Sequence, residues 1–372
     1  MDCLERFKQY YEEEKEIINQ NIIQYNQRLE SEPNPLLKDN NHLLCQLNMD
    51  GKRIRGVLAN LGYYLLSENK DYANSLALAF EIFQTSILVH DDVIDNDDTR
   101  RGKDTIHCAN RKKYSEISKQ TDEVESISKS IAICMGDYGL YLSNQILCES
   151  YFNDPNLPRA LKMYFDMALT TVKGELIDVI LPFQGKHHLI NPQQIEEQIL
   201  EIYRLKTAFY TIIGPLSTGF LLAGGEVTFL PYIAEFGEKV GIAFQIQDDI
   251  LGIFSNDMGK IKGSDIREFK QTVLYSHILN TNYKEEFLKY YGNGDISDET
   301  IHKVQDLLIN SGSYDYAINM MNQMYDEGIK IIDSWRTLIH INLKVSKCFI
   351  SEIILNIHKA IRSRGRLFIN SS

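Results

Sequence analysis

The chain has 372 residues, of which 44% are hydrophobic and 24% charged, and its formal net charge at pH 7 is −12. These proportions are ordinary for a globular protein with a substantial core. The negative charge argues against nucleic acid as a partner, because phosphate backbones bind net basic surfaces. Six cysteines without paired spacing predict reduced thiols and a cytoplasmic location. The amino-terminal residues lack an apolar signal segment, and no apolar run reaches the roughly 18 residues of a membrane span.

Apolar residues recur at helical spacing through most of the chain. One series predicts a helix that leads into Asp91, and it consists of Leu76, Phe80, Phe83 and Ile87. A second series predicts a helix that leads into Asp248, and it consists of Ile233, Phe236, Val240 and Phe244. Other helical segments are predicted at 54–66, 131–150, 159–181, 195–223, 271–281, 299–309, 314–333 and 337–362.

This pattern predicts an all-α fold, with one domain over residues 1–372. We expect a bundle of about ten to thirteen helices around a deep apolar cavity. Residues 111–130 are polar and nearly free of large apolar side chains, so we predict an exposed loop there.

Two aspartate clusters stand 157 residues apart at the ends of these apolar stretches, Asp91-Asp92-Val93-Ile94-Asp95 and Asp248-Asp249. On a helix, Asp91 and Asp95 lie roughly 40° apart, with Asp92 beside them. Carboxylates held so closely repel unless a cation lies between them. Mg²⁺ commonly bridges carboxylates and substrate phosphates. The clusters therefore predict a magnesium-dependent diphosphate site, although the first cluster alone also fits a solvated acidic face or a helix cap.

Basic residues accompany both clusters: Arg100, Arg101 and Lys103 follow the first, and Lys260 and Lys270 follow the second. A separate basic segment at 51–56 contains Lys52 and Arg55, which share a helix face. Alone, this segment also fits an ordinary basic helix start. Together, one pocket with metal ligands and one purely basic pocket predict binding of two different diphosphates.

Five motifs in this order resemble the trans-isoprenyl diphosphate synthases, the family of the farnesyl and geranylgeranyl diphosphate synthases. They are GKRIR, DDVIDNDDTRRGKDTIH, the pair Lys206-Thr207, FQIQDDILGIF and GKIKGSDIREFK, and they span residues 50 to 275. The resemblance implies the isoprenoid synthase fold, usually as a homodimer. It implies Mg²⁺-dependent condensation of isopentenyl diphosphate with an allylic diphosphate by ionisation, condensation and elimination.

The resemblance also implies roles for individual residues. The implied metal ligands are Asp91, Asp92, Asp95, Asp248 and Asp249. The residues implied to bind the allylic diphosphate are Arg100, Lys206, Lys260 and Lys270. The residues implied to bind isopentenyl diphosphate are Lys52, Arg55, Gln84 and Arg101. Thr207 and Gln245 would face the developing carbocation, and Gln245 also shares a helix face with Asp248 and Asp249 by its spacing. Lys206, Thr207, Gln245 and Arg100 form the implied catalytic set.

Some positions depart from the family pattern. Gly252 stands where a third aspartate of the second motif is common, and Glu175 stands where a glutamine is usual three residues before Asp178. In this family the residues upstream of the first motif form the floor of the product tunnel. Here Ser86 and Ile87 leave that floor open, and Phe83 would stop the chain about one helical turn, or 5.4 Å, deeper. On an ideal helix Ser86 points away from the Asp91 face, so its placement depends on the resemblance alone. These residues predict geranylgeranyl diphosphate (C20).

Four alternatives are weighed against this prediction. They are a synthase of C15 or of C25 and longer products, a class I terpene cyclase, a non-catalytic subunit of a heteromeric synthase, and a helical interaction module. A cyclase has no use for a second, purely basic pocket, and a non-catalytic subunit is expected to have lost its aspartates.

Overall fold

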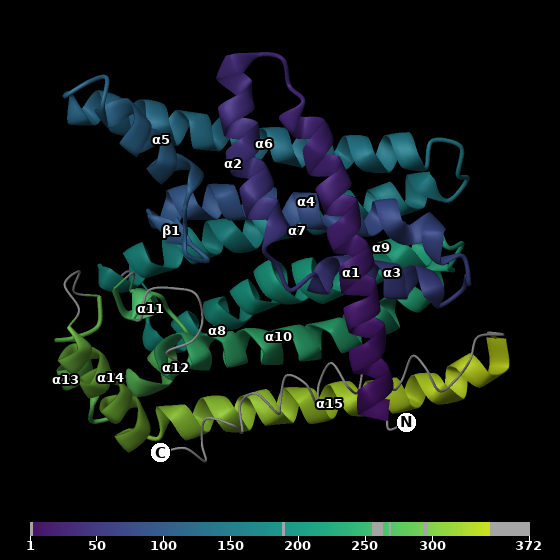
Figure 1. The fold of residues 1–372 in the computed structure, drawn as a ribbon. Helices are drawn as coiled ribbons and strands as arrows, with labels where there is room; N and C mark the ends of the chain where they lie inside the picture. The colour runs from purple at the N-terminus through teal and green to yellow at the C-terminus, as the bar shows by residue number, and fades with distance from the viewer. Residues whose placement is uncertain (1–2, 188–189, 255–262, 268, 293–296, 343–372) are drawn as a thin grey trace. The chain divides into compact units, whose positions relative to one another are not determined.

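The computed structural model describes residues 3–187, 190–254, 263–267, 269–292 and 297–342. These residues are helical nearly throughout, which confirms the all-α prediction (Figure 1). By their internal contacts they divide into two compact units. The amino-terminal unit comprises residues 8–161 and 218–224, and the carboxy-terminal unit comprises most of the remainder. The single domain and its deep cavity stay predictions.

In the amino-terminal unit, α4 (Lys70–Asp95) is the central helix. It packs most extensively against α6 (Thr121–Ser150) and also against α3 (Ile54–Tyr64). The helices α1 (Cys3–Glu30), α2 (Pro35–Met49) and α5 (Ile106–Ser115) complete the unit. The predicted apolar series is confirmed, since Leu76, Phe80 and Phe83 are at most 2% exposed. The sequence series did not include α1 and α2, whose polar composition hides their apolar stripe.

The predicted loop at 111–130 was wrong. Residues 111–115 complete α5 and residues 121–130 begin α6, so only the five residues between them connect helices. The first turns of α6 are polar because most of their side chains face solvent, while Val124 and Ser128, four residues apart, are buried. An inward face this narrow does not stand out in the sequence.

The described residues contain one small sheet. The strands β1 (Thr99–Arg100) and β2 (Lys103–Asp104) pair antiparallel, with Arg100 opposite Lys103. Arg101 and Gly102 form the turn, and both have positive φ, 53° and 77°. Two such residues give the turn twist that a two-residue hairpin requires. Strand pairing therefore directs the side chains that follow the first aspartate cluster.

In the carboxy-terminal unit, α10 (Leu230–Phe254) packs along α15 (Ser313–Asn342) and against η1 (Tyr203–Ile213). The segment predicted as one helix at 195–223 is α8 (Pro192–Ile202), the π-helix η1 and α9 (Gly214–Leu222). The remaining helices are α7 (Leu157–Lys186), which begins in the other unit, η2 (Val227–Phe229), α11 (Ser264–Arg267), α12 (Val273–Ile278), α13 (Lys284–Phe287) and α14 (Asp298–Asn310). No helix of the described residues is long and apolar enough to cross a membrane. Most of the helix predicted at 337–362 lies outside the described residues, and residues 337–342 continue α15.

Candidate functional site

The first aspartate cluster occupies the last turn and a half of α4. Asp91 is half-buried, Asp92 is 1% exposed and Asp95 is exposed. Arg100 on β1 donates from Nε to Asp92 and from Nη2 to Asp91 over 3.3 Å. Burial raises the pKa of Asp92 to about 7, although the guanidinium of Arg100 opposes this shift. The middle aspartate thus anchors Arg100, while its two neighbours are the more accessible carboxylates.

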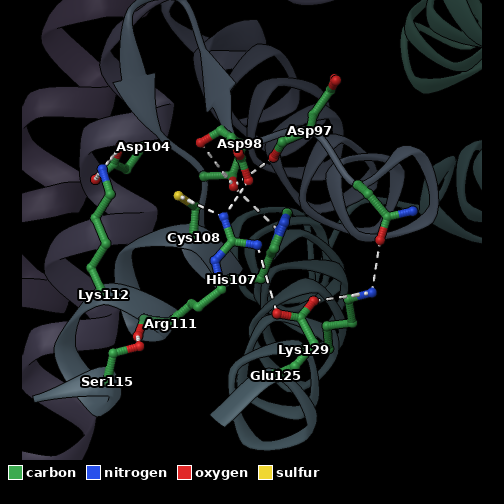
Figure 2. Close-up of polar contacts among 12 residues, drawn as sticks. Asp97, Asp98, Asp104, His107, Cys108, Arg111, Lys112, Ser115, Glu125 and Lys129 are labelled. Carbon is green, nitrogen blue, oxygen red and sulfur yellow. Dashed lines mark hydrogen bonds and ion pairs between the residues drawn. The ribbon is translucent and has the colours of Figure 1, made fainter. Parts of the chain in front are cut away.

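Polar contacts tie the segment after this cluster to α5 and α6 (Figure 2). Arg111 on α5 pairs with Asp98, and its other terminal nitrogen lies 3.6 Å from Glu125 on α6. Lys129 on α6 lies 3.2 Å from Glu125 and donates to Asn96 Oδ1 over 2.7 Å. The chain between the cluster and Arg100 is therefore held from two helices.

The basic segment at 51–56 lies in the same unit. Lys52 is exposed, and Arg55 is half-buried in the first turn of α3. A Cβ built on Gly51 would lie 3.7 Å from Nη1 of Arg101, so Arg101 reaches this segment. Desolvation and the neighbouring guanidinium groups of Arg100 and Arg53 lower the pKa of Arg101. Cations crowded in this way favour a bound anion.

A small cavity of about 10 Å³ lies beside these cations, lined by Leu47, Asp50, Thr85, Leu88, Arg100, Arg101 and Lys103. Gln84 precedes Thr85 on α4 and is half-buried. It follows Glu81 by three residues and so shares its helix face, and Glu81 contacts the start of α3 through the backbone of Gly56. The structure thus brings Arg100 and Arg101 to one cavity.

The second aspartate cluster lies on α10 in the carboxy-terminal unit. Asp249 is 1% exposed and accepts hydrogen bonds from Tyr203 Oη and from Gln245 Nε2, the latter over 2.8 Å. Gln245 Oε1 in turn accepts from Thr207 Oγ1 over 2.5 Å. Burial raises the pKa of Asp249 to about 7, against the lowering effect of Lys270. Asp248 is half-buried and is the more accessible carboxylate of the pair.

Tyr203 was missed by sequence reasoning. It is 3% exposed, and its hydroxyl also accepts the backbone N–H of Val273 over 3.1 Å. No local pattern marks it, because its partner Asp249 is 46 residues away in the chain.

Lys206 and Thr207 are held by the π-helix η1. The Lys206 ammonium lies 2.7 Å from Asp178 and 2.8 Å from Glu175, both on α7. A Cβ on Gly174 would lie 2.6 Å from the Lys206 backbone nitrogen, so only glycine allows α7 to approach η1 this closely. The π-helical geometry shifts side chains relative to an α-helix and is frequent at functional sites. Glu175, the residue that departs from the family pattern, is thus a second carboxylate on Lys206.

The other departure, Gly252, also has a structural reason. A Cβ at this position would lie 2.4 Å from Oδ2 of Asp265, which is itself 3% exposed. The carboxylate of Asp265 therefore occupies the space into which a side chain at position 252 would extend. Lys270 follows this turn, and its backbone N–H donates to the Asp265 carbonyl oxygen over 3.0 Å. Lys260 lies outside the described residues.

The donor sets suit a metal shared with a phosphate ligand. Within the described ranges, no group of three or more His, Cys, Asp or Glu side chains converges closely enough to hold a metal. Mg²⁺ at phosphate sites, however, commonly uses one or two carboxylates and takes its other oxygens from phosphate and water. Asp91 and Asp95 on α4, and Asp248 on α10, fit that requirement. Asp92 and Asp249 fit it less well, because each is only 1% exposed and is buried against donors of its own unit.

Comparisons with known proteins agree with these features. The family model of polyprenyl synthetase matches residues 38–308. A geranylgeranyl diphosphate synthase of Sulfolobus acidocaldarius is 29% identical over 286 residues, which are 75% of this chain and 79% of that protein. A geranylfarnesyl diphosphate synthase of Natronomonas pharaonis is 27% identical over 344 residues, 86% of this chain and 90% of that one.

Solved structures are similar over nearly the whole chain. The crystal structure of a geranylgeranyl pyrophosphate synthase from Corynebacterium glutamicum, complexed with isoprenyl diphosphate and magnesium, has a TM-score of 0.79 and 26% sequence identity. The match covers 92% of this chain and 97% of that one.

Proposed function

Because the chain belongs to the polyprenyl synthetase family and is a trans-prenyltransferase, we propose that it makes geranylgeranyl diphosphate from isopentenyl diphosphate and an allylic diphosphate. One observation carries this proposal. The amino-terminal unit holds two groups of cations in different settings: Arg100 lies beside the accessible carboxylates Asp91 and Asp95, whereas Arg101 reaches the basic segment, where the neighbouring carboxylate of Asp50 is already paired with Lys103. An allylic diphosphate that must ionise needs the first, and isopentenyl diphosphate, which keeps its diphosphate, needs only the second.

The proposed metal is Mg²⁺, for which each unit offers accessible carboxylates of its own: Asp91 and Asp95 in the amino-terminal unit and Asp248 in the carboxy-terminal unit. When bound, it would neutralise the charge that accumulates on a departing diphosphate. In the amino-terminal unit Arg100 would bind the allylic diphosphate, and Asp92 keeps its guanidinium in place. In the carboxy-terminal unit Lys206 and Lys270 are the candidate cations for an allylic diphosphate. Isopentenyl diphosphate would be held by Lys52 and Arg55 of the basic segment together with Gln84 and Arg101.

The remaining chemistry needs no protein nucleophile. The allylic C–O bond breaks with both electrons leaving on the diphosphate, and the double bond of isopentenyl diphosphate forms the new C–C bond. A proton is then lost to the released diphosphate, and a new double bond remains. Thr207 donates to Gln245, which orients the amide oxygen of Gln245 as a fixed dipole suited to a neighbouring carbocation.

Chain length is proposed from the residues before the first aspartate cluster. Phe83 is 2% exposed and Ile87 is half-buried, so an aromatic ring lies two turns before Asp91 and an aliphatic side chain one turn before it. This spacing supports a C20 product. A geranylfarnesyl synthase among the relatives makes a C25 product the specific alternative.

We also propose that the protein is a homodimer in the cytoplasm. Exposed apolar side chains on α7 support a second copy as the partner: Leu169, Leu176 and Phe183 are 64%, 57% and 63% exposed and recur at seven-residue intervals on one helix face. Sedimentation velocity tests this, and a single species at 42.9 kDa would contradict it.

Product analysis tests the proposed reaction. Purified protein is incubated with Mg²⁺, radiolabelled isopentenyl diphosphate and, separately, C5, C10 and C15 allylic diphosphates, and the dephosphorylated alcohols are separated by length. A discrete C20 alcohol is expected. A ladder of longer alcohols would keep the reaction and contradict the C20 product. Cyclised hydrocarbon from the allylic substrate alone would indicate a cyclase, and no turnover of folded protein would indicate a non-catalytic subunit.

A further inference from the structure

Arg53, in the middle of the basic segment, is the residue on which the start of α3 is built. Although it is charged, it is 3% exposed, and it takes the left-handed conformation with φ 57° and ψ 24°. A left-handed backbone is unfavourable for a residue with a side chain and persists only where surrounding contacts enforce it. The contacts of Arg53 must therefore compensate for its conformation.

The Arg53 guanidinium donates four hydrogen bonds. Its Nε donates to Asn19 Oδ1 of α1 over 2.8 Å, and its Nη2 donates to the carbonyl oxygens of Asn48 and Met49 over 2.7 and 2.9 Å. Its Nη1 donates to Glu81 Oε2 of α4 over 3.3 Å. Only the planar, five-donor fork of arginine serves four acceptors in such different directions.

Glu81 connects this anchor to α4. Its other oxygen, Oε1, accepts the backbone N–H of Gly56 in the first turn of α3 over 2.9 Å, and the side chain is 2% exposed. The same carboxylate therefore fixes both the side chain before α3 and the backbone of its first turn. Removing one member of a buried pair leaves the other charge uncompensated, so the two residues act as a unit.

We propose that the Arg53–Glu81 pair is a positioning element for the pocket of isopentenyl diphosphate. The pair keeps Lys52 and Arg55 where they can bind this diphosphate together with Arg101 and Gln84. This proposal rests on the function proposed above for that pocket. Arg53 directly follows Lys52 and stands two residues before Arg55, and its own guanidinium is buried. A Cβ on Gly51 would lie 2.8 Å from Arg53 Nη1 and 3.7 Å from Arg101 Nη1, so both guanidinium groups lie beside Gly51.

Neither side chain is accessible to a substrate, since Arg53 and Glu81 are each at most 3% exposed. Both are buried, and their opposite charges compensate each other, so they add little net charge to the pocket. Their effect is to set where the chain presents Lys52 and where α3 begins. Misplacing binding groups by about 1 Å can cost on the order of a hundredfold in rate.

The test uses the full-length enzyme with three variants. Arg53→Gly keeps the left-handed backbone at low cost and removes the guanidinium. Arg53→Lys keeps the charge but cannot reach all four acceptors, and Glu81→Gln keeps an acceptor for Gly56 but removes the charge. We expect each to raise KM for isopentenyl diphosphate about tenfold or more, with KM for the allylic diphosphate within about twofold and kcat little changed. The double variant Arg53→Lys/Glu81→Gln should be less than additive.

Two controls separate the possible outcomes. Tyr151→Phe removes buried hydrogen bonds to Tyr72 and Leu76 in the same unit, and at a similar loss of Tm it should leave KM for isopentenyl diphosphate unchanged. If it raises this KM equally, the effect is general destabilisation and the proposal fails. Lys52→Ala tests the pocket itself. A raised KM there, with unchanged Arg53 and Glu81 variants, would overturn the positioning role alone, whereas no effect of Lys52→Ala would overturn the pocket assignment and this inference together.

Discussion

The hydroxyl of Ser86 on α4 donates a hydrogen bond of 2.6 Å to the main-chain carbonyl of Gly136 on α6. The two helices approach closely at this contact, since a Cβ on Gly139 would come within 2.9 Å of Ser86 Cβ. Ser86 is 0% exposed. Its side chain therefore belongs to the α4–α6 packing, as the helical wheel indicates when it places Ser86 off the Asp91 face.

This packing bears on the substitution Ser86→Phe. From the family resemblance alone, a phenylalanine here would close the floor of the product tunnel and shorten the product to C15. A ring at this position must instead displace α6, and overpacking of this kind commonly costs about 1–3 kcal/mol. We expect Ser86→Phe to lower Tm together with any change in product, whereas Ile87→Phe, on the Asp91 face, should give C15 with a smaller loss. A Ser86→Phe enzyme that makes C15 at unchanged Tm would contradict the packing described here.

Phe83 is predicted to end the product. Phe83→Leu should allow elongation by at least one C5 unit, because it shortens the side chain at that depth. Ile82→Val is the matched control, since Ile82 is equally buried and lies about 180° from Asp91 on the helix. Chromatography of the dephosphorylated alcohols checks both variants. Unchanged C20 from Phe83→Leu would show that another residue stops the chain.

Helices with a strong apolar period were predictable from the sequence. Side-chain pairs whose members are distant in the chain were not. Phe80 and Phe83 mark α4 because both face its core. Tyr203 and Asp249 are 46 residues apart, and Arg53 and Glu81 are 28 apart, so neither pair is visible as a pattern. Glu81 did leave a signal, since it is a lone charge within an otherwise apolar series.

Individual side-chain roles were predicted less completely than the motifs that contain them. Spacing places Asp91, Asp92 and Asp95 on one helix face, but it does not show that Asp92 is buried against Arg100. The π-helical form of η1 was also not predictable, because the segment continues the apolar period of the neighbouring helices. Its geometry depends on close packing, such as that of Gly241 against Ala208, where a Cβ would lie within 2.3 Å.

Glu175 is expected to weaken binding of the allylic diphosphate. It adds a second carboxylate to Lys206, so two carboxylates compete with a phosphate oxygen for the charge and the donors of the ammonium group. Glu175→Gln should therefore lower KM for the allylic diphosphate several-fold, and KM for isopentenyl diphosphate should not change. Glu201→Gln, which removes a comparable pair with Arg204, is the control. A higher allylic KM would mean that Glu175 helps substrate binding, contrary to this prediction.

Tyr203 is expected to support Asp249 and Gln245. Tyr203→Phe leaves the buried Asp249 with one donor fewer and the Val273 N–H without its acceptor, and each buried group left unsatisfied costs about 1–3 kcal/mol. We expect a lower Tm and a kcat reduced about tenfold, because loss of outer contacts to a functional carboxylate commonly has this effect. Tyr316→Phe, which loses the hydrogen bond to Glu196 in the same unit, should lower Tm without this loss of kcat. Equal kcat values for the two variants would assign Tyr203 a purely structural role.

His107 is expected to make the protein less stable in mild acid. Burial, with the nearby guanidinium of Arg111, lowers its pKa against the opposing effect of Glu125 and Asp98. The unfolded chain, in which the pKa is about 6.5, therefore binds more protons than the folded protein as pH falls through that value. The free energy of unfolding must decrease from about pH 6.5 downward until the folded pKa is passed. Urea unfolding is measured between about pH 8 and pH 5, on either side of the unfolded pKa. The free energy of unfolding should decrease less steeply with falling pH for His107→Gln than for the unaltered protein. Parallel curves would mean that His107 contributes nothing to the acid sensitivity.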